Sequence, residues 1–326
     1  MKVLITGGAG FIGSNLSEKL VKLGYKVTVI DNLSTGRLNN LKKIKNKIKF
    51  INYDISKDSK RFRNFFKNVK WVFHLAGLAD IVPSIKEPKK YFKANVEGTL
   101  NVVNAARDKK VKKLIYAASA SCYGIPKKFP TNEKAKIDTK YPYALTKFLG
   151  EKLVIDWFKI YKANNLSLRF FNVYGPNSRT TGAYGAVFGV FLAQKLFNKP
   201  LTIVGNGRQT RDFVHVYDLV KGLIKAAKKG KPGKIYNIGS GKETKINHIA
   251  KLIGGKRIFI PKRPGEPERS LACIKKIKKE LNWRPKISIE RGVSELLKTK
   301  NSWKNAPVWT SKKIKLATKV WFKYLK

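Results

Sequence analysis

The 326-residue sequence has two cysteines, few acidic residues and no long apolar run. Cys122 and Cys273 cannot build a disulfide framework, and we expect both to be small apolar packing residues. A membrane-spanning helix needs about 20 consecutive apolar residues, which the chain does not contain. The N-terminal run Met1 to Thr6 has neither the longer apolar stretch nor the cleavage site of a signal peptide. We therefore expect a soluble, cytoplasmic protein with no membrane partner.

The shortage of acidic residues leaves a large positive charge. Seventy Lys and Arg residues against twenty Asp and Glu residues give a formal net charge of +50. Such a field attracts polyanions, so nucleic-acid binding has to be considered. The lysines are scattered in pairs such as Lys42-Lys43, Lys112-Lys113 and Lys312-Lys313, without a basic tail, zinc-finger spacing or aromatic RNA-binding signature. We favour solvated lysines on helix faces and loops, and expect neither a specific nucleic-acid partner nor a metal site.

The N-terminus has the pattern of a dinucleotide-binding turn. The apolar run Val3 to Thr6 predicts a buried strand, and Gly7, Gly10 and Gly13 follow it at Gly-x-x-Gly-x-x-Gly spacing. Gly8, Gly10 and Gly13 also fit Gly-x-Gly-x-x-Gly, and leucines at helical spacing follow. Glycines at these positions allow a tight turn and let the backbone approach a pyrophosphate at the helix N-terminus.

The ends of the next strands fit the same site. The second predicted strand, Val27 to Ile30, ends at Asp31. A carboxylate there would accept hydrogen bonds from both adenosine ribose hydroxyls and would repel a 2′-phosphate, so we expect NAD rather than NADP. Asp54 and Ile55 follow the third strand, and His74 to Gly77 end the fourth with small residues that let the backbone approach a dinucleotide. We interpret His74 itself as a structural histidine rather than a base.

Strands and helices alternate along most of the chain. This alternation predicts an α/β fold with a Rossmann-type doubly wound parallel sheet and a smaller mixed α/β C-terminal substrate lobe. Further strands are predicted at residues 49–53, 71–75, 113–118, 166–171, 201–204 and 235–238, and helices at residues 96–107, 146–161 and 188–197.

The pattern also predicts how the chain is divided. We expect an NAD-binding domain at residues 1–176, with residues 205–241 returning to it, and a substrate-binding lobe at residues 177–204 and 242–300. Residues 301–326 would form a C-terminal helical extension. Its tryptophans, Trp303, Trp309 and Trp321, would dock it on the body; an exposed partner surface is the alternative.

Tyr143 and Lys147 stand four residues apart, on one face of a predicted helix. A free phenol has a pKa of about 10 and is a poor base at neutral pH. A nearby positive charge favours the phenolate and lowers that pKa. Alone, the pair could be an ordinary surface Tyr and Lys of a lysine-rich chain. Downstream of a dinucleotide site, it predicts redox chemistry on an alcohol.

Six ordered motifs resemble those of the extended short-chain dehydrogenase/reductases, and specifically of the NAD-dependent nucleotide-sugar epimerase/dehydratase group. The resemblance covers nearly the whole chain. It implies a tightly bound NAD, a UDP-sugar substrate and a homodimer through paired helices, one of which carries the catalytic tyrosine. The motifs are the glycine turn, Asp31 to Gly36, Asp54-Ile55, Tyr143 with Lys147, Arg169 to Pro176 with Gln209 to Val216, and Arg263 to Glu266.

The resemblance also implies roles for single residues. Tyr143 would be the general base and Lys147 its electrostatic partner and a ribose ligand. Ser119, four residues before Tyr123-Gly124, would be the hydroxyl partner, with Ser121 as a competitor at a less suitable spacing. The cofactor would contact Gly7, Gly10, Phe11, Ile12, Gly13, Asp31, Asn32, Ser34, Thr35, Gly36, Asp54, Ile55, Leu75, Ala76, Gly77, Asn95, Tyr143, Lys147 and Phe171. The substrate would contact Ser119, Asn172, Val204, Arg211, Arg263 and Ser270, with both arginines on the diphosphate.

Within this group, the residues after Ser119 discriminate between reactions. Related 4,6-dehydratases carry an Asp-Glu pair there and related decarboxylases keep the Glu, whereas this chain has Ala120 and Ser121, which cannot transfer a proton. The resemblance therefore implies a 4-epimerase that works through a transient 4-keto sugar. Ser270 stands where a Tyr restricts such enzymes to plain hexoses and a small residue admits 2-N-acetyl sugars. We expect turnover of UDP-glucose/galactose and of the N-acetyl pair.

Two alternatives stay open at this stage. One is another NAD-dependent nucleotide-sugar oxidoreductase or epimerase on the same scaffold, which would consume external cofactor or need a further base. The other is a non-catalytic protein whose basic surface engages RNA or a membrane.

Overall fold

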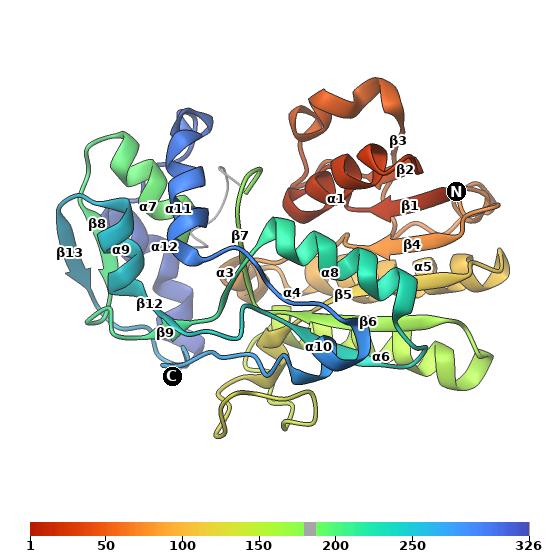
Figure 1. The fold of residues 1–326 in the computed structure, drawn as a ribbon. Helices are drawn as coiled ribbons and strands as arrows, with labels where there is room; N and C mark the ends of the chain where they lie inside the picture. The colour runs from red at the N-terminus through yellow and green to blue at the C-terminus, as the bar shows by residue number, and fades with distance from the viewer. Residues whose placement is uncertain (179–186, 326) are drawn as a thin grey trace.

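The structure is a computed structural model that describes residues 1–178 and 187–325. Its main sheet contains β1 (Lys2–Thr6), β2 (Lys26–Asp31), β3 (Ile48–Asn52), β4 (Trp71–His74), β5 (Lys113–Ser119), β6 (Asn165–Phe170) and β11 (Ile235–Ile238). The seven strands are all parallel and lie in the order β11-β6-β5-β4-β1-β2-β3 (Figure 1). The predicted doubly wound parallel sheet is confirmed, and the predicted strand ends differ from the observed ones by at most one residue.

Helices cover both faces of this sheet. Val3 and Ile5 of β1 belong to a hydrophobic core on one face, whereas Leu4 belongs to the core on the other face. Because both faces are buried, these strands are continuous apolar runs in the sequence. The long helices are α1 (Phe11–Lys22) and α8 (Val216–Lys229) in the first core, and α5 (Gly98–Asp108) and α6 (Pro142–Tyr161) in the second. Shorter elements are η1 (Leu38–Lys47), α2 (Lys60–Asn64), α3 (Ile81–Lys86), α4 (Pro88–Phe92), η2 (Lys93–Glu97) and η3 (Ala120–Tyr123).

A third hydrophobic core holds a smaller lobe together. Its elements include α7 (Val187–Leu196), β8 (Leu201–Val204), β9 (Thr210–Arg211), β12 (Thr244–Lys245), α9 (Ile246–Ile253), β13 (Arg257–Ile260) and α11 (Ile289–Lys298). β8 pairs in parallel with β13, and β9 pairs antiparallel with β12. A further parallel pair, β7 (Asn172–Tyr174) and β10 (Phe213–His215), leads from the sheet into this lobe.

One helix departs from the predicted division of the chain. α10 (Lys275–Leu281), expected in the smaller lobe, packs against α8 and β11. Its apolar residues Ile277 and Leu281 join the core of the main sheet. They stand four residues apart on one face of the helix. That spacing predicts a buried face but does not indicate which body the face covers.

The C-terminal segment folds back onto the body. It consists of η4 (Lys300–Trp303) and α12 (Ser311–Tyr324). Trp303 and Trp321 are only 3% and 4% exposed, as expected for a docked extension rather than an exposed surface. α12 lies against α3 of the sheet domain, while Ile314 belongs to the core of the smaller lobe. The segment therefore bridges the two bodies. Within the described residues, no helix combines the length and apolarity needed to cross a membrane.

Candidate functional site

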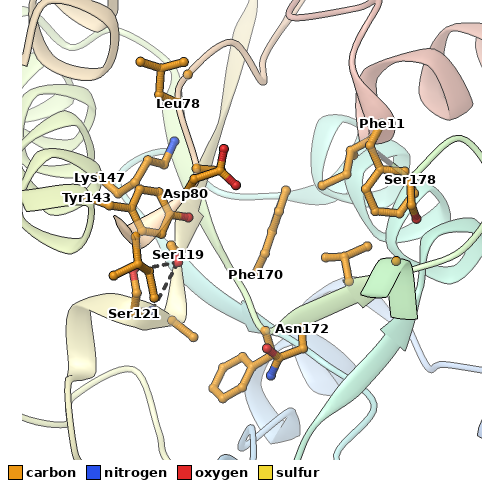
Figure 2. A pocket seen from close by; sticks show the side chains of 18 of the residues that line it. Phe11, Leu78, Asp80, Ser119, Ser121, Tyr143, Lys147, Phe170, Asn172 and Ser178 are labelled. Carbon is orange, nitrogen blue, oxygen red and sulfur yellow. Dashed lines mark hydrogen bonds between the residues drawn. The ribbon is translucent and has the colours of Figure 1, made fainter. Parts of the chain in front are cut away.

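A cavity of about 730 Å3 lies between the carboxyl edge of the main sheet and the smaller lobe. Loops gather at this edge of a parallel sheet, which is where such folds bind ligands. Figure 2 shows side chains from several elements around this pocket. All the predicted site residues line the cavity except Gly36 and Asn95. Among the described residues, no group of three or more His, Cys, Asp or Glu side chains could hold a metal ion.

The glycine turn brings the N-terminus of α1 to the cavity. Gly7 has a φ of 72°, which a glycine adopts without strain. A side chain at Gly13 would collide with the carbonyl oxygen of Gly7, so the turn can be this tight only with glycine there. Gly10 starts the helix without a side-chain cap, and Phe11 and Ile12 of the first turn line the cavity. Uncapped amides at the positive end of a helix suit an anionic group such as a pyrophosphate.

Asp31 lies next to this turn at the end of β2. Its Oδ2 accepts a hydrogen bond from the amide of Ala9 at 2.9 Å, and its Oδ1 accepts one from the amide of Leu33 at 2.8 Å. Burial raises the pKa of the Asp31 carboxyl, and these two amides oppose that shift. A carboxylate has about four acceptor positions, so further hydrogen bonds can be accepted from the cavity. Gly36 packs against this carboxylate, where a Cβ would lie 2.8 Å from Oδ1.

Asn95 acts behind the cavity wall. Its Oδ1 accepts a hydrogen bond from the Leu78 amide at 2.8 Å. Its Nδ2 donates to the Leu78 carbonyl and to Thr146 Oγ1, both at 3.0 Å. Asn95, which was predicted to contact the cofactor, is only 1% exposed. It shapes the loop after β4, and that loop lines the cavity.

Tyr143 and Lys147 enter the cavity from the start of α6. The helix begins at Pro142, four residues earlier than predicted, because proline suits the first helical position. Both side chains therefore lie on the first two turns, next to each other in Figure 2. Ser119 ends β5, and its Oγ accepts hydrogen bonds from the Ser121 hydroxyl at 2.8 Å and the Ser121 amide at 3.1 Å. Ser121 also lines the cavity, so both candidate serines lie at the site.

The electrostatics of this pair differ from the prediction. Burial raises the pKa of Tyr143; hydrogen bonding to Ser119 favours the phenolate, whereas the charge of Asp80 disfavours it. The predicted fall of the Tyr143 pKa is therefore not seen, because burial outweighs the groups that favour the phenolate. Burial lowers the pKa of Lys147 to about 7, with Glu151 opposing the shift. Desolvation disfavours the charged form of both groups, and it outweighs their partners here.

Two arginines that line the cavity converge on one carboxylate, that of Glu266. Arg211 Nη2 lies 2.7 Å from Glu266 Oε1, and Arg263 Nε lies 3.0 Å from Glu266 Oε2. Both guanidinium groups line the cavity. Two planar guanidinium groups that reach one point form a suitable site for a diphosphate. The other predicted substrate residues, Asn172, Val204 and Ser270, line the same cavity.

His74 is a structural residue, as predicted. Its Nδ1 lies 2.7 Å from Thr6 Oγ1 and its Nε2 lies 2.9 Å from Thr99 Oγ1. Burial, and then the charge of Lys147, lowers the pKa of His74 to about 3. A ring that is fully buried, neutral and hydrogen-bonded at both nitrogens is not available as a base.

Several lining residues were missed by the sequence analysis. Asp80 precedes α3 and faces the pocket in Figure 2. A carboxyl residue in the loop after a predicted strand could have suggested it. Tyr141 and Trp321 also line the cavity. Tyr141 stands beside the Tyr-Lys motif, whereas no local signal places Trp321 near it.

The chain is similar in sequence and structure to known proteins of one family. Residues 3–239 match the model of the NAD dependent epimerase/dehydratase family. The structure of UDP-glucose 4-epimerase from Thermotoga maritima with UDP-glucose is 32% identical, has a TM-score of 0.86 and covers 93% of this chain and 99% of its own. UDP-N-acetylglucosamine 4-epimerase from Methanobrevibacter ruminantium, in complex with UDP-N-acetylmuramic acid, is 30% identical, with a TM-score of 0.87 over 92% and 98% of the two chains. UDP-glucuronic acid 4-epimerase from Bacillus cereus, with UDP-glucuronic acid and NAD, is 30% identical, with a TM-score of 0.85 over 93% and 99%. All three are named as 4-epimerases, but of different sugars.

Proposed function

Because the chain belongs to the NAD dependent epimerase/dehydratase family, we propose that it is a nucleotide-sugar 4-epimerase, an isomerase that inverts C4 of a UDP-hexose with tightly bound NAD. The observation that supports this most is one cavity lined by the N-terminus of α1, Asp31, the hydroxyl of Ser119, and the pair Tyr143 and Lys147. The position after Ser119 is Ala120, so the Asp-Glu pair of related dehydratases is not present beside it. Inversion of C4 needs one base and one hydride acceptor. Tyr143 can act as the base, and the dinucleotide site would hold NAD as the hydride acceptor.

The cofactor would lie along the carboxyl edge of the sheet. The amides at the start of α1 would bind the pyrophosphate, Asp31 the adenosine ribose, and Lys147 the second ribose. NAD held by these residues would supply the hydride acceptor for C4 of the sugar. In this division of the chain, residues 1–176 and 205–241 bind the cofactor. Residues 177–204 and 242–300 would form the substrate lobe, apart from α10 on the main sheet, and residues 179–186 lie outside the described part.

The protein's own residues would handle the proton and hold the substrate. Tyr143 Oη takes the proton of the sugar 4-hydroxyl and gives it back after the 4-keto sugar has turned over. Ser119 Oγ donates a hydrogen bond to the sugar O4, and the charge of Lys147 offsets part of the burial that disfavours the phenolate. Arg211 and Arg263 hold the diphosphate throughout, which leaves the sugar free to rotate.

A panel of UDP-sugars tests this function directly. Purified protein should invert C4 of at least one UDP-hexose, detected by NMR, without added NAD(P)H. A requirement for added NAD(P)H would instead indicate a net oxidoreductase on the same scaffold. If no sugar is inverted and a nucleic-acid gel shift persists at moderate salt, the non-catalytic binding protein gains support, because nonspecific phosphate contacts weaken as salt rises.

Replacement of Asp31 by alanine tests the cofactor assignment. A hydrogen bond to a charged group contributes about 1.5–3 kcal/mol, so the variant should bind NAD on the order of 10- to 100-fold more weakly. Loss of the carboxylate should also reduce the discrimination against NADP. Fluorescence titration with both cofactors measures this, with Glu18→Ala, which breaks only a surface pair with Lys22, as the control. An unchanged preference for NAD over NADP would contradict the assignment.

Ser270 carries the prediction about the sugar. Its small side chain lines the cavity, which leaves room beside C2 for an N-acetyl group. We expect turnover of UDP-N-acetylglucosamine/galactosamine as well as UDP-glucose/galactose. Ser270→Tyr should abolish turnover of the N-acetyl pair and keep that of the plain pair, as measured by NMR. Wild-type protein that inverts only the plain hexoses would reject this prediction.

We infer a cytoplasmic homodimer with no specific nucleic-acid partner. The family resemblance implies pairing through two helices, one of which is α6. Leu145, on α6, is 37% exposed, so its side chain can contact a second copy. Sedimentation velocity should give a dimer, and Leu145→Glu should shift it toward monomer.

A further inference from the structure

The C-terminal helix α12 supplies one wall of the active-site cavity. Trp321, near the end of this helix, is 4% exposed and lines the same cavity as Tyr143 and Arg263. The sequence separates Trp321 from both of these residues, and the fold brings the three together. α12 thus contributes to the site as well as stabilising the smaller lobe.

Trp321 stands between the two functional ends of the cavity. On one side, its ring centroid lies 6.4 Å from that of Tyr141, which in turn stacks on Tyr143 with centroids 6.3 Å apart and planes 9° apart. On the other side, the guanidinium carbon of Arg263 lies 5.2 Å from the Trp321 ring. Nε1 of Trp321 also donates a 2.7 Å hydrogen bond to the carbonyl of Pro264. The Trp321 ring therefore contacts Tyr141, which lies two residues before the proposed base, and also the loop that carries Arg263, a proposed ligand of the diphosphate.

The helix that carries this indole is firmly docked. Thr310 caps its N-terminus, accepting a hydrogen bond from the Lys313 amide at 3.3 Å. Ile314 and Thr318 are 3% and 2% exposed, and the helix lies against α3. At its far end, the carbonyl of Leu325 is close enough to the Gly265 loop to crowd any side chain placed there. The buried side chains of Ile314 and Thr318 hold the helix, and with it Trp321, against the body.

We propose that Trp321 is a positioning residue that sets the distance between the proton-transfer end and the diphosphate-binding end of the active site. This inference rests on the proposed 4-epimerase function. A UDP-sugar bridges these two ends, because its diphosphate binds near Arg263 while its C4 must reach Tyr143. Loss of the indole lets the Tyr141 loop and the Arg263 loop shift independently. A small misplacement of a reacting group costs up to about 10²-fold in rate.

The test compares Trp321→Ala, Trp321→Phe and Leu316→Ala, a control on the same helix that is 74% exposed. Trp321→Ala should lower kcat for the UDP-sugar by about 10- to 100-fold. It should weaken UDP binding, measured by calorimetry, by up to roughly 30-fold, as expected for the loss of a cation–π contact between Arg263 and a buried indole. Trp321→Phe keeps a ring but loses the hydrogen bond to Pro264, and should lower kcat several-fold. Leu316→Ala should match the wild type in both measurements.

A purely structural role gives a different result. If Trp321→Ala lowers the melting temperature but keeps kcat and the UDP Kd within twofold of wild type below that temperature, the proposal is overturned. If Trp321→Ala does not fold, Trp321→Phe decides, and wild-type kcat in that variant overturns the proposal. If the wild-type protein inverts no UDP-sugar, the proposed function fails. The UDP affinities of the same variants then still report whether Trp321 orders Arg263.

Discussion

Tyr143→Phe is expected to lower kcat by about 10²- to 10⁴-fold while the protein folds and keeps its NAD. The substitution removes one oxygen and leaves the ring, so the stacking on Tyr141 is preserved. The lost group is the only proton acceptor that the proposed mechanism places at the sugar 4-hydroxyl. NMR detection of C4 inversion, together with the NAD content of the purified variant, measures both halves of the expectation.

Tyr141→Phe is the matched control. It removes the same atom from a neighbouring ring that lines the same cavity and lies nearly parallel to the ring of Tyr143. Its kcat should fall by much less than that of Tyr143→Phe, because the Tyr141 hydroxyl takes no part in proton transfer in the proposed reaction. Equal losses in the two variants, or substantial epimerisation by Tyr143→Phe, would remove Tyr143 from its role as the base.

The sheet and the cofactor-side residues were predictable because their signals are local. A strand buried on both faces is an apolar run, and β1 leads directly into the turn that starts at Gly7. The carboxyl ends of parallel strands meet at one edge, so Asp31, Asp54 and Ser119 were expected to lie together without any knowledge of the loops. All three line the cavity.

The remaining features depend on contacts between distant parts of the chain. Trp321 reaches Tyr141 through the docking of α12, which helical spacing alone does not reveal. Ser121 was set aside on spacing, yet a short 3-10 turn, η3, brings its hydroxyl to Ser119. The pKa of Tyr143 depends on how deeply the ring is buried, and the distance to Lys147 along the sequence does not report burial. The sequence therefore predicted which side chains lie together better than it predicted their pKa values.

The helix that carries Tyr143 and Lys147 is tied to the sheet by a buried ion pair. Glu151 of α6 and Arg169 of β6 are both almost fully buried. Arg169 Nη2 lies 2.5 Å from Glu151 Oε1, and Arg169 Nε lies 3.0 Å from Oε2. Ser167 donates a further hydrogen bond of 2.9 Å to Glu151 Oε2. Glu151 also favours the charged form of Lys147, one helical turn away, against the burial that lowers its pKa.

Glu151→Ala should therefore lower the free energy of unfolding by about 3–5 kcal/mol, because it leaves the Arg169 guanidinium buried without its counter-charge. Denaturant unfolding measures the change. Glu18→Ala, on α1, breaks only a surface pair with Lys22 and should cost less than about 1 kcal/mol. The double variant Glu151→Leu/Arg169→Met removes both charges and should recover most of the loss, since a buried pair can often be replaced by apolar packing. A Glu151→Ala variant no less stable than Glu18→Ala would show that solvent or another group already compensates Arg169. The stability of the catalytic helix would then have to come from its hydrophobic face alone.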